Sequence, residues 1–279
     1  MKISQILQIN EAKTVDDLDE LFVSIKRDCG EFLKITDEDT PLYRGISLAD
    51  GTIDFSKKRQ HRIDRRPLDS KKSFTTFFNV MCEVSTGITN IRGRSVYASQ
   101  RGFAVSDYGV PTYMFPAGNI KVLWSPEIRD STLSFQKFVA NLAENLNEVF
   151  KEDGFDFSKF SLGEFFSLFD DISTEQDPGS LFKPGPAGAK KLYDIVARRD
   201  TDLKELVHGK TSDVEWQRGL IKAFKLTFER FYKVGGPELL KQALSADKPA
   251  EIAIIESDGY YILPLDRYYG RFLERIRDS

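Results

Sequence analysis

The amino-acid sequence predicts an α+β protein whose strands are divided by a large helical insertion. Strand-like segments occur up to residue 130, helical periodicity dominates residues 131–246, and two further strand-like segments follow. Strands, then helices, then strands are typical of an α+β fold, because an α/β fold would alternate the two. We therefore expect a domain made of residues 12–130 and 247–279, with 131–246 inserted as helices and 1–11 preceding it.

The N-terminal part begins with a predicted helix over residues 15–35, whose apolar positions recur at helical spacing. Acidic Asp16 and Asp17 lie near its expected start, where they favour helix formation. A second helix is expected over 71–82. Strands are expected at 41–46, 94–99, 113–116 and 121–124.

The predicted insertion starts with an amphipathic helix, because five apolar side chains after Ser131 share one helical face. These are Phe135, Phe138, Val139, Leu142 and Leu146. Further helices are expected at 155–169, 189–208 and 213–246, with a Pro/Gly-rich loop at 177–188. Residues 251–255 and 260–263 read as strands, and the Glu-Ser-Asp-Gly sequence between them predicts a hairpin.

Composition excludes several classes of function. The chain has 279 residues, with 40 Lys+Arg, 43 Asp+Glu and a net charge of −3. Its 2 Cys and 2 His are too few for a disulfide scaffold or a Cys- or His-based metal centre, so we expect no metal. No apolar run approaches the roughly 18 residues of a membrane span, so we expect no membrane partner.

A basic segment is hidden by this near-neutral total. Eight Lys and Arg residues stand between positions 57 and 72 against Asp64 and Asp69. The segment is either a solvated loop or a surface for phosphate or RNA. In the second case Arg62, Arg65 and Arg66 are the candidate target-binding residues, and an RNA- or DNA-binding protein is one functional hypothesis.

The first eleven residues read either as the first turns of a helix or as a targeting leader. They begin Met-Lys and end Ile9-Asn10-Glu11. This pattern resembles the capsid-targeting leaders of T4-like phage internal proteins, which are cut after a Leu/Ile-x-Glu tripeptide. The resemblance implies a protein packaged in the capsid interior, located in the phage virion, the host bacterial cytoplasm or both.

Three separated motifs carry a second resemblance. They are Leu-Tyr-Arg-Gly at 42–45, the segment from Arg94 to Gly109, and Ala-Glu-Ile-Ala-Ile at 250–254. Together they resemble the ADP-ribosyltransferase superfamily: the first is similar to its arginine-serine-glutamate class, including the T4-type phage enzymes. The second is similar to the poly(ADP-ribose) polymerase branch, with Tyr97 and Tyr108 eleven residues apart. Residues 65–126 also resemble an uncharacterised tailed-phage family.

The resemblance implies a split β-sheet core and a role for each motif residue. Five residues would bind NAD, which serves as the substrate: Arg44, Gly45, Tyr97, Ser99 and Tyr108. Glu251 would supply the catalytic carboxylate. Three positions depart from the pattern. Arg44 stands where the polymerase branch has His, Ala250 replaces the usual Asn or the first Glu of Glu-x-Glu, and Val105 stands where the polymerase branch often has a Ser that binds the carboxamide. A second alignment places Tyr260 in the glutamate position, which would leave the protein without its catalytic carboxylate.

These residue types suit cleavage of the nicotinamide–ribose bond. A carboxylate stabilises the cationic transition state, a guanidinium holds pyrophosphate or ribose oxygens, and an aromatic face covers the nicotinamide ring. The motifs therefore predict a phage mono-ADP-ribosyltransferase that modifies a host protein or nucleic acid. The alternative is a catalytically inactive relative acting as a virion or host-interaction protein.

Overall fold

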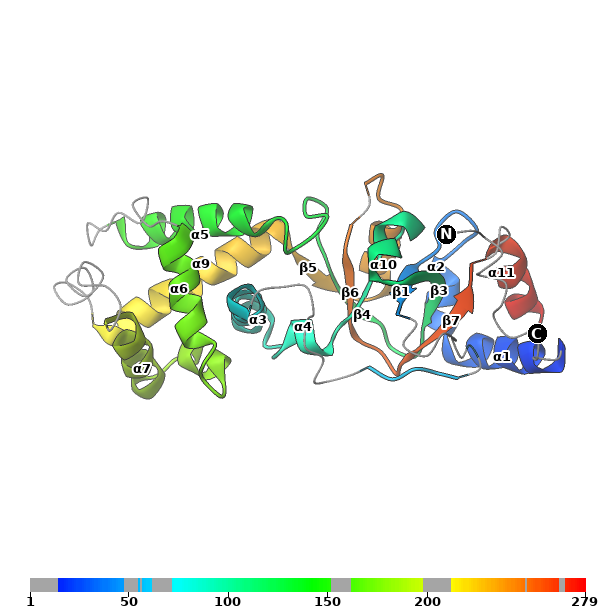
Figure 1. Ribbon diagram of the computed structural model, residues 1–279, viewed down its shortest axis with the longest axis horizontal. Coiled ribbons are helices and arrows are strands. Elements are labelled where there is room, and N and C mark those ends of the chain that lie inside the picture. Colours follow the sequence, from blue (N-terminus) through cyan, green and yellow to red (C-terminus); the bar gives the residue numbers. More distant parts are fainter. Residues whose placement is uncertain are drawn as a thin grey trace. The chain divides into compact units, whose positions relative to one another are not determined.

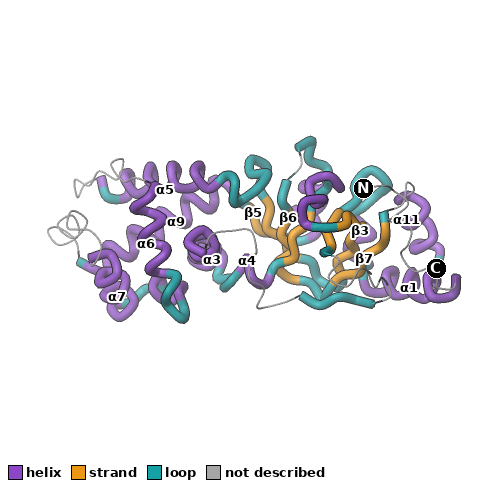
Figure 2. Tube along the Cα trace, in the orientation of Figure 1, coloured by secondary structure: helices purple, strands orange, loops and turns teal. Residues whose placement is uncertain are grey.

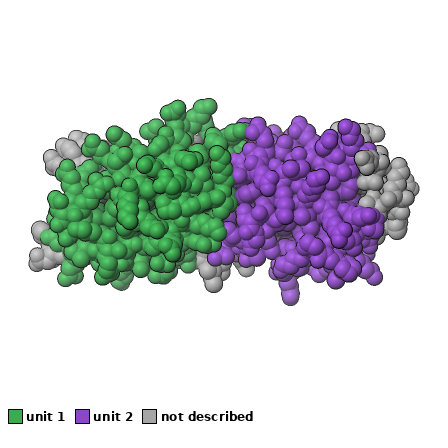
Figure 3. All heavy atoms as spheres, turned by 180° about the vertical axis from the view of Figure 1, so that it is seen from behind, with its two compact units in different colours: residues 1–63, 95–129, 233–279 green, residues 64–94, 130–232 purple. Residues whose placement is uncertain are grey.

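A computed structural model describes residues 15–47, 55, 57–61, 72–151, 162–197, 212–248, 250–265 and 269–279. The leader-like residues 1–11 and the basic residues Arg62, Arg65 and Arg66 lie outside these ranges. The chain divides into two compact units, coloured separately in Figure 3. Unit 1 consists of residues 1–63, 95–129 and 233–279, and unit 2 of residues 64–94 and 130–232.

Unit 1 is built on two antiparallel sheets (Figure 1). The three-stranded sheet has the order β1 (Tyr43–Ile46), β3 (Val110–Pro116) and β7 (Tyr260–Pro264). The four-stranded sheet has the order β2 (Val96–Ala98), β6 (Ile252–Glu256), β4 (Lys121–Trp124) and β5 (Lys233–Gly235). A backbone bridge between Tyr43 and Ser99 links the start of β1 to the end of β2.

Five helical elements accompany these sheets in the described part of unit 1. They are α1 (Val15–Asp28), α2 (Gly30–Ile35), the 3-10 helix η2 (Gly102–Tyr108), α10 (Pro237–Leu244) and α11 (Tyr269–Asp278). One apolar core joins both sheets to α1, α2, α10 and α11, with Phe22, Phe32 and Leu240 fully buried from the helices. The helix expected at 15–35 is thus two helices, because Cys29 separates α1 from α2.

Among the described residues of unit 2, all regular secondary structure is helical, with loops between the helices (Figure 2). Its elements are α3 (Lys72–Thr86), α4 (Ile91–Arg94), α5 (Phe135–Val149), α6 (Leu162–Ile172), η5 (Pro178–Phe182), α7 (Pro186–Ala197) and α9 (Asp213–Phe231). The expected apolar face of α5 is confirmed, since all five of its predicted residues are buried. Phe77 of α3 packs against Phe135, Phe169 and Phe224 at ring-centroid distances of 5.1, 5.2 and 5.8 Å.

Two further sequence expectations were wrong. The predicted hairpin does not form, because β6 pairs with β2 and β4 while β7 pairs with β3 in the other sheet. The turn signal at residues 256–259 therefore marks a crossing between sheets, where Gly259 adopts a φ of +115° against the Arg59 carbonyl. The helical stretch expected over 213–246 is interrupted by β5: α9 ends at Phe231, Tyr232 is extended, and α10 begins again at Pro237.

The class of fold is the one expected, a mixture of α-helices with antiparallel β-sheets. Within the described ranges, none of the helices is both long and apolar enough to cross a bilayer.

Candidate functional site

The first two motifs meet where β1 passes the end of β2. Tyr43 N–H donates to the Ser99 carbonyl at 2.7 Å, and Ser99 N–H donates back to the Tyr43 carbonyl at 2.9 Å. The side chain of Arg44 reaches the same strand, since its Nη1 donates to the Tyr97 carbonyl at 2.7 Å. Residues 53 positions apart are thus joined by backbone and side-chain hydrogen bonds.

The second and third motifs meet through the pairing of β2 with β6. Tyr97 lies opposite Ala253, and Ala98 lies opposite Ile252. Continuing this antiparallel register by one residue sets Ser99 opposite Glu251, and directly opposed residues lie on the same face of a sheet.

That face is the one turned away from the apolar core. Val96, Ala98, Ile252 and Ile254 are buried in the core of unit 1. Because side chains alternate along a strand, Tyr97 and Ser99 occupy the opposite face, and the register carries Glu251 to it as well. Extended by one residue, the register therefore puts Tyr97, Ser99 and Glu251 on the same face of this sheet.

The Gly45 position explains how Tyr108 approaches β1. A Cβ on Gly45 would overlap the Val105 carbonyl oxygen and lie 3.0 Å from the Tyr108 Cβ. Only glycine therefore lets η2 lie directly on β1. Val105 is buried beneath this contact, whereas Tyr108 at the end of η2 is 50% exposed.

The segment in front of Glu251 is held on two sides. Glu251 N–H donates to the Arg129 carbonyl at 3.0 Å. The preceding residue, Ala250, donates its N–H to the Gln100 side chain at 3.1 Å. Gln100 was not predicted from the sequence, since a polar residue at a strand end carries no signal of burial.

Tyr260, the residue of the alternative alignment, lies in the other sheet. It is 6% exposed, and the Arg44 guanidinium lies 5.5 Å from the centroid of its ring. His61 packs edge-on against the same ring at 6.1 Å and contacts the Ser257 hydroxyl at 2.6 Å. Tyr260 thus offers an aromatic face to Arg44, whereas Glu251 directly precedes β6 in the other sheet.

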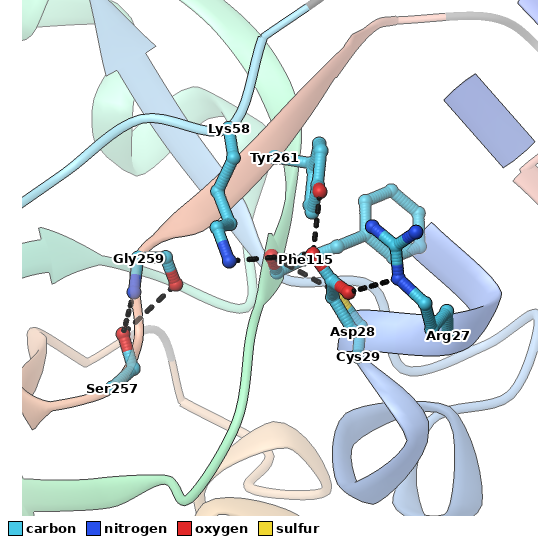
Figure 4. Close-up of polar contacts among 8 residues, drawn as sticks. All are labelled: Arg27, Asp28, Cys29, Lys58, Phe115, Ser257, Gly259 and Tyr261. Atoms are coloured by element: carbon cyan, nitrogen blue, oxygen red, sulfur yellow. Dashed lines mark hydrogen bonds and ion pairs between the residues drawn. The ribbon is translucent and has the colours of Figure 1, made fainter. Parts of the chain in front are cut away.

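A separate polar cluster at the end of α1 involves the first residues of the basic segment (Figure 4). The Asp28 carboxylate accepts hydrogen bonds from Arg27 Nε at 2.7 Å, Tyr261 OH at 2.7 Å and Lys58 Nζ at 3.3 Å. The Arg27 hydrogen bond, with those of Tyr261 and Lys58, holds the pKa of Asp28 well below its usual range. Burial, then its bond to Asp28, raises the pKa of Tyr261.

This Asp28 cluster has a structural role. Arg59 adds a pair of backbone hydrogen bonds to Tyr260, at 2.8 and 2.9 Å. The neighbouring Cys29 thiol donates to the Phe115 carbonyl at 3.5 Å, and burial raises its pKa, so it is held as an unreactive thiol. Lys58 and Arg59 are therefore fastened to unit 1.

In the described part of the chain, no three His, Cys, Asp or Glu side chains gather closely enough to hold a metal ion. Comparisons of the chain with protein-family models, with curated proteins and with solved structures found no match.

Proposed function

We propose that this chain is a mono-ADP-ribosyltransferase of the phage type, with the split-sheet core of that superfamily in unit 1. It would transfer ADP-ribose from NAD to a host protein or nucleic acid. The leader-like start further suggests packaging in the virion and action in the host cytoplasm. The division of the strands of unit 1 into two antiparallel sheets supports this proposal.

One observation carries the proposal: the three motifs, the first and third of which lie about 200 positions apart in the sequence, come together at adjoining strand ends. The Arg44 side chain bonds to the backbone of β2, and the β2–β6 register sets Ser99 opposite Glu251. If the three motifs did not form one site, we would not expect an arginine, a small hydroxyl residue and a carboxylate from distant segments to come together.

The chemistry assigned to each residue follows from its type and surroundings. Arg44 offers a rigid guanidinium to pyrophosphate or ribose oxygens, and the exposed ring of Tyr108 offers a face to nicotinamide. The ribose C1′–nitrogen bond breaks, and its electron pair leaves with neutral nicotinamide. The acceptor atom bonds to C1′ and passes its proton to the Glu251 carboxylate, which also stabilises the cationic transition state.

The direct test is calorimetry of NAD binding to the full chain. Wild type should bind NAD, and Arg44→Ala should bind it at least tenfold more weakly. Because Arg44 also bonds to Tyr97, thermal melting of each variant must accompany the titration. Arg277→Ala is the matched control, since Arg277 donates to the Thr36 carbonyl at 3.0 Å on another part of unit 1. Equal NAD affinity in Arg44→Ala, or no binding by wild type, would contradict the proposal.

Transfer is tested with labelled NAD and a host lysate. Label should appear on protein or nucleic acid, and protease or nuclease treatment then identifies the acceptor class. Absence of both label transfer and NAD hydrolysis would remove the enzymatic function.

A second candidate is an inactive relative that keeps the fold as an interaction protein. It is favoured by the engagement of Arg44, whose guanidinium already meets the Tyr97 carbonyl and the Tyr260 ring. This candidate predicts no NAD turnover by wild type and no change in partner binding when Glu251 is replaced.

A further inference from the structure

We infer that Gln100 is a positioning residue that holds the backbone in front of Glu251, and thereby places the Glu251 carboxylate. The inference rests on the proposed function, because it concerns how the proposed catalytic residue is set in place. Gln100 directly follows Ser99 at the end of β2 and is 4% exposed.

The amide of Gln100 makes three hydrogen bonds, two of them to the approach segment of β6. Its Nε2 donates to the Lys248 carbonyl at 2.5 Å. Its Oε1 accepts from Ala250 N–H at 3.1 Å and from the Ser99 hydroxyl at 3.3 Å. One side chain thus links the hydroxyl of the second motif to the backbone of the third.

This bonding supplies what the sheet does not. β6 begins at Ile252, so neither Lys248 nor Ala250 belongs to a strand. Backbone groups outside a strand need other partners, and the Gln100 amide supplies an N–H for the Lys248 carbonyl and an oxygen for the Ala250 N–H. The backbone at Glu251 is then restrained by two hydrogen bonds, one from Ala250 N–H to Gln100 and one from Glu251 N–H to the Arg129 carbonyl.

Loss of the amide would leave the Lys248 carbonyl and the Ala250 N–H without these bonds. The segment would shift to find other partners, and Glu251 would move with it. A displacement of about 1 Å at a reacting group costs on the order of 10²-fold in rate. Substrate affinity depends on Arg44 and Tyr108, which Gln100 does not touch in any hydrogen bond described here, so it should change little.

Unit 2 contains a matched control. Gln217 of α9 is fully buried, and its Nε2 donates to the carbonyls of Leu181 at 2.6 Å and Lys183 at 3.0 Å. Its Oε1 accepts from Gly185 N–H at 3.3 Å. It therefore holds a loop with the same chemistry as Gln100, in the unit that contains none of the residues proposed to bind NAD or to act on it.

The experiment compares Gln100→Met with Gln217→Met, because methionine keeps the length of the side chain and removes the amide. NAD hydrolysis is measured on the full chain, alone and in a Glu251→Gln background. We expect Gln100→Met to lower kcat about 10- to 100-fold with KM for NAD within about twofold. It should cause no further loss once Glu251 is replaced, and Gln217→Met should leave kcat unchanged.

Amide hydrogen exchange gives a readout that is independent of activity. The Ala250 N–H should exchange at least tenfold faster in Gln100→Met than in wild type, and at the wild-type rate in Gln217→Met. Unchanged exchange, an unchanged kcat in Gln100→Met, or an equal loss in the Glu251→Gln background would each overturn the inference while leaving the proposed function standing. A wild-type chain that neither binds nor hydrolyses NAD would overturn both.

Discussion

Both units have an apolar core, but unit 1 also joins its segments by strand pairing and polar contacts, whereas the core of unit 2 consists largely of phenylalanines packed between helices. In unit 1, backbone pairing joins β1 to the end of β2 and β2 to β6, so that segments far apart in the sequence lie side by side. In unit 2, the ring of Phe77 packs against those of Phe135, Phe169 and Phe224, with ring centroids no more than 5.8 Å apart. Strand register therefore decides which residues meet in unit 1, whereas the fit of side-chain volumes decides which residues meet in unit 2.

The buried polar side chains of the two units show the same difference. In unit 2, Arg92 donates to the Ser131 hydroxyl at 2.6 Å and its guanidinium lies 4.9 Å from the Phe74 ring centroid. All of these contacts are within the core of unit 2. In unit 1, Gln100 and Arg44 connect segments that carry motif residues. Burial of a polar group alone therefore does not indicate a site; what the group holds in place does.

The largest effect is expected at Glu251. Glu251→Gln should lower NAD hydrolysis by about 10²- to 10⁴-fold, because it removes the base and the negative charge while keeping the shape. Glu256→Gln at the other end of β6 is the matched control, since Glu256 is exposed and pairs only across the surface with Lys121 at 3.4 Å. Equal rates for the two variants would show that unit 1 carries no catalytic carboxylate at this strand.

The next effect tests the packing of unit 2. Phe77→Ala should lower the free energy of unfolding by about 3–5 kcal/mol, because it leaves a cavity among Phe135, Phe169 and Phe224. The chain has 2 Trp, with Trp216 in unit 2 and Trp124 in unit 1. Urea unfolding followed by Trp216 fluorescence in a Trp124→Phe background reports the loss directly. Turnover per folded molecule should stay at the level of that background, and a fall would tie the site to unit 2.

Elements with strong local signals could be predicted from the sequence. The five apolar positions of α5 have a period that only a helix satisfies, and all five are buried. The strands β4 and β6 were likewise expected within one residue at each end. The partners of β6 and β7 could not be predicted, because a short turn signal does not specify whether the next strand stays in the same sheet.

The candidate site divides in the same way. Arg44, Ser99 and Glu251 could be proposed because their residue types and order resemble a known pattern. Gln100 could not, because its role depends on contacts with Lys248 and Ala250, about 150 positions away. Long-range hydrogen bonds of this kind leave no local periodicity in the sequence.

A smaller effect is expected at the glycine under η2. Gly45→Ala should cost about 1–3 kcal/mol of stability, because its Cβ would overlap the Val105 carbonyl. Moving η2 should also displace Tyr108 and raise KM for NAD severalfold. Gly219→Ala in unit 2 is the matched control, since its Cβ would meet the Phe150 ring and so alter stability alone. An equal KM for NAD in the two variants would show that Tyr108 does not contribute to NAD binding.

The smallest effect, confined to acid, is expected at Asp28. Its pKa is lower in the folded chain than the roughly 3.9 of an unfolded aspartate, because Arg27, Tyr261 and Lys58 donate to the carboxylate. The unfolded chain therefore takes up the proton first, so this contribution to stability is full above about pH 4 and is lost as the pH falls below it. Asp28→Asn should flatten the decline of the urea midpoint between about pH 4 and pH 2, and Tyr261→Phe, which removes one donor, should flatten it partly.

The transition is followed by Trp124 fluorescence in a Trp216→Phe background, because the cluster belongs to unit 1. A slope as steep in Asp28→Asn as in that background would mean that other carboxylates, not this cluster, give unit 1 its sensitivity to acid.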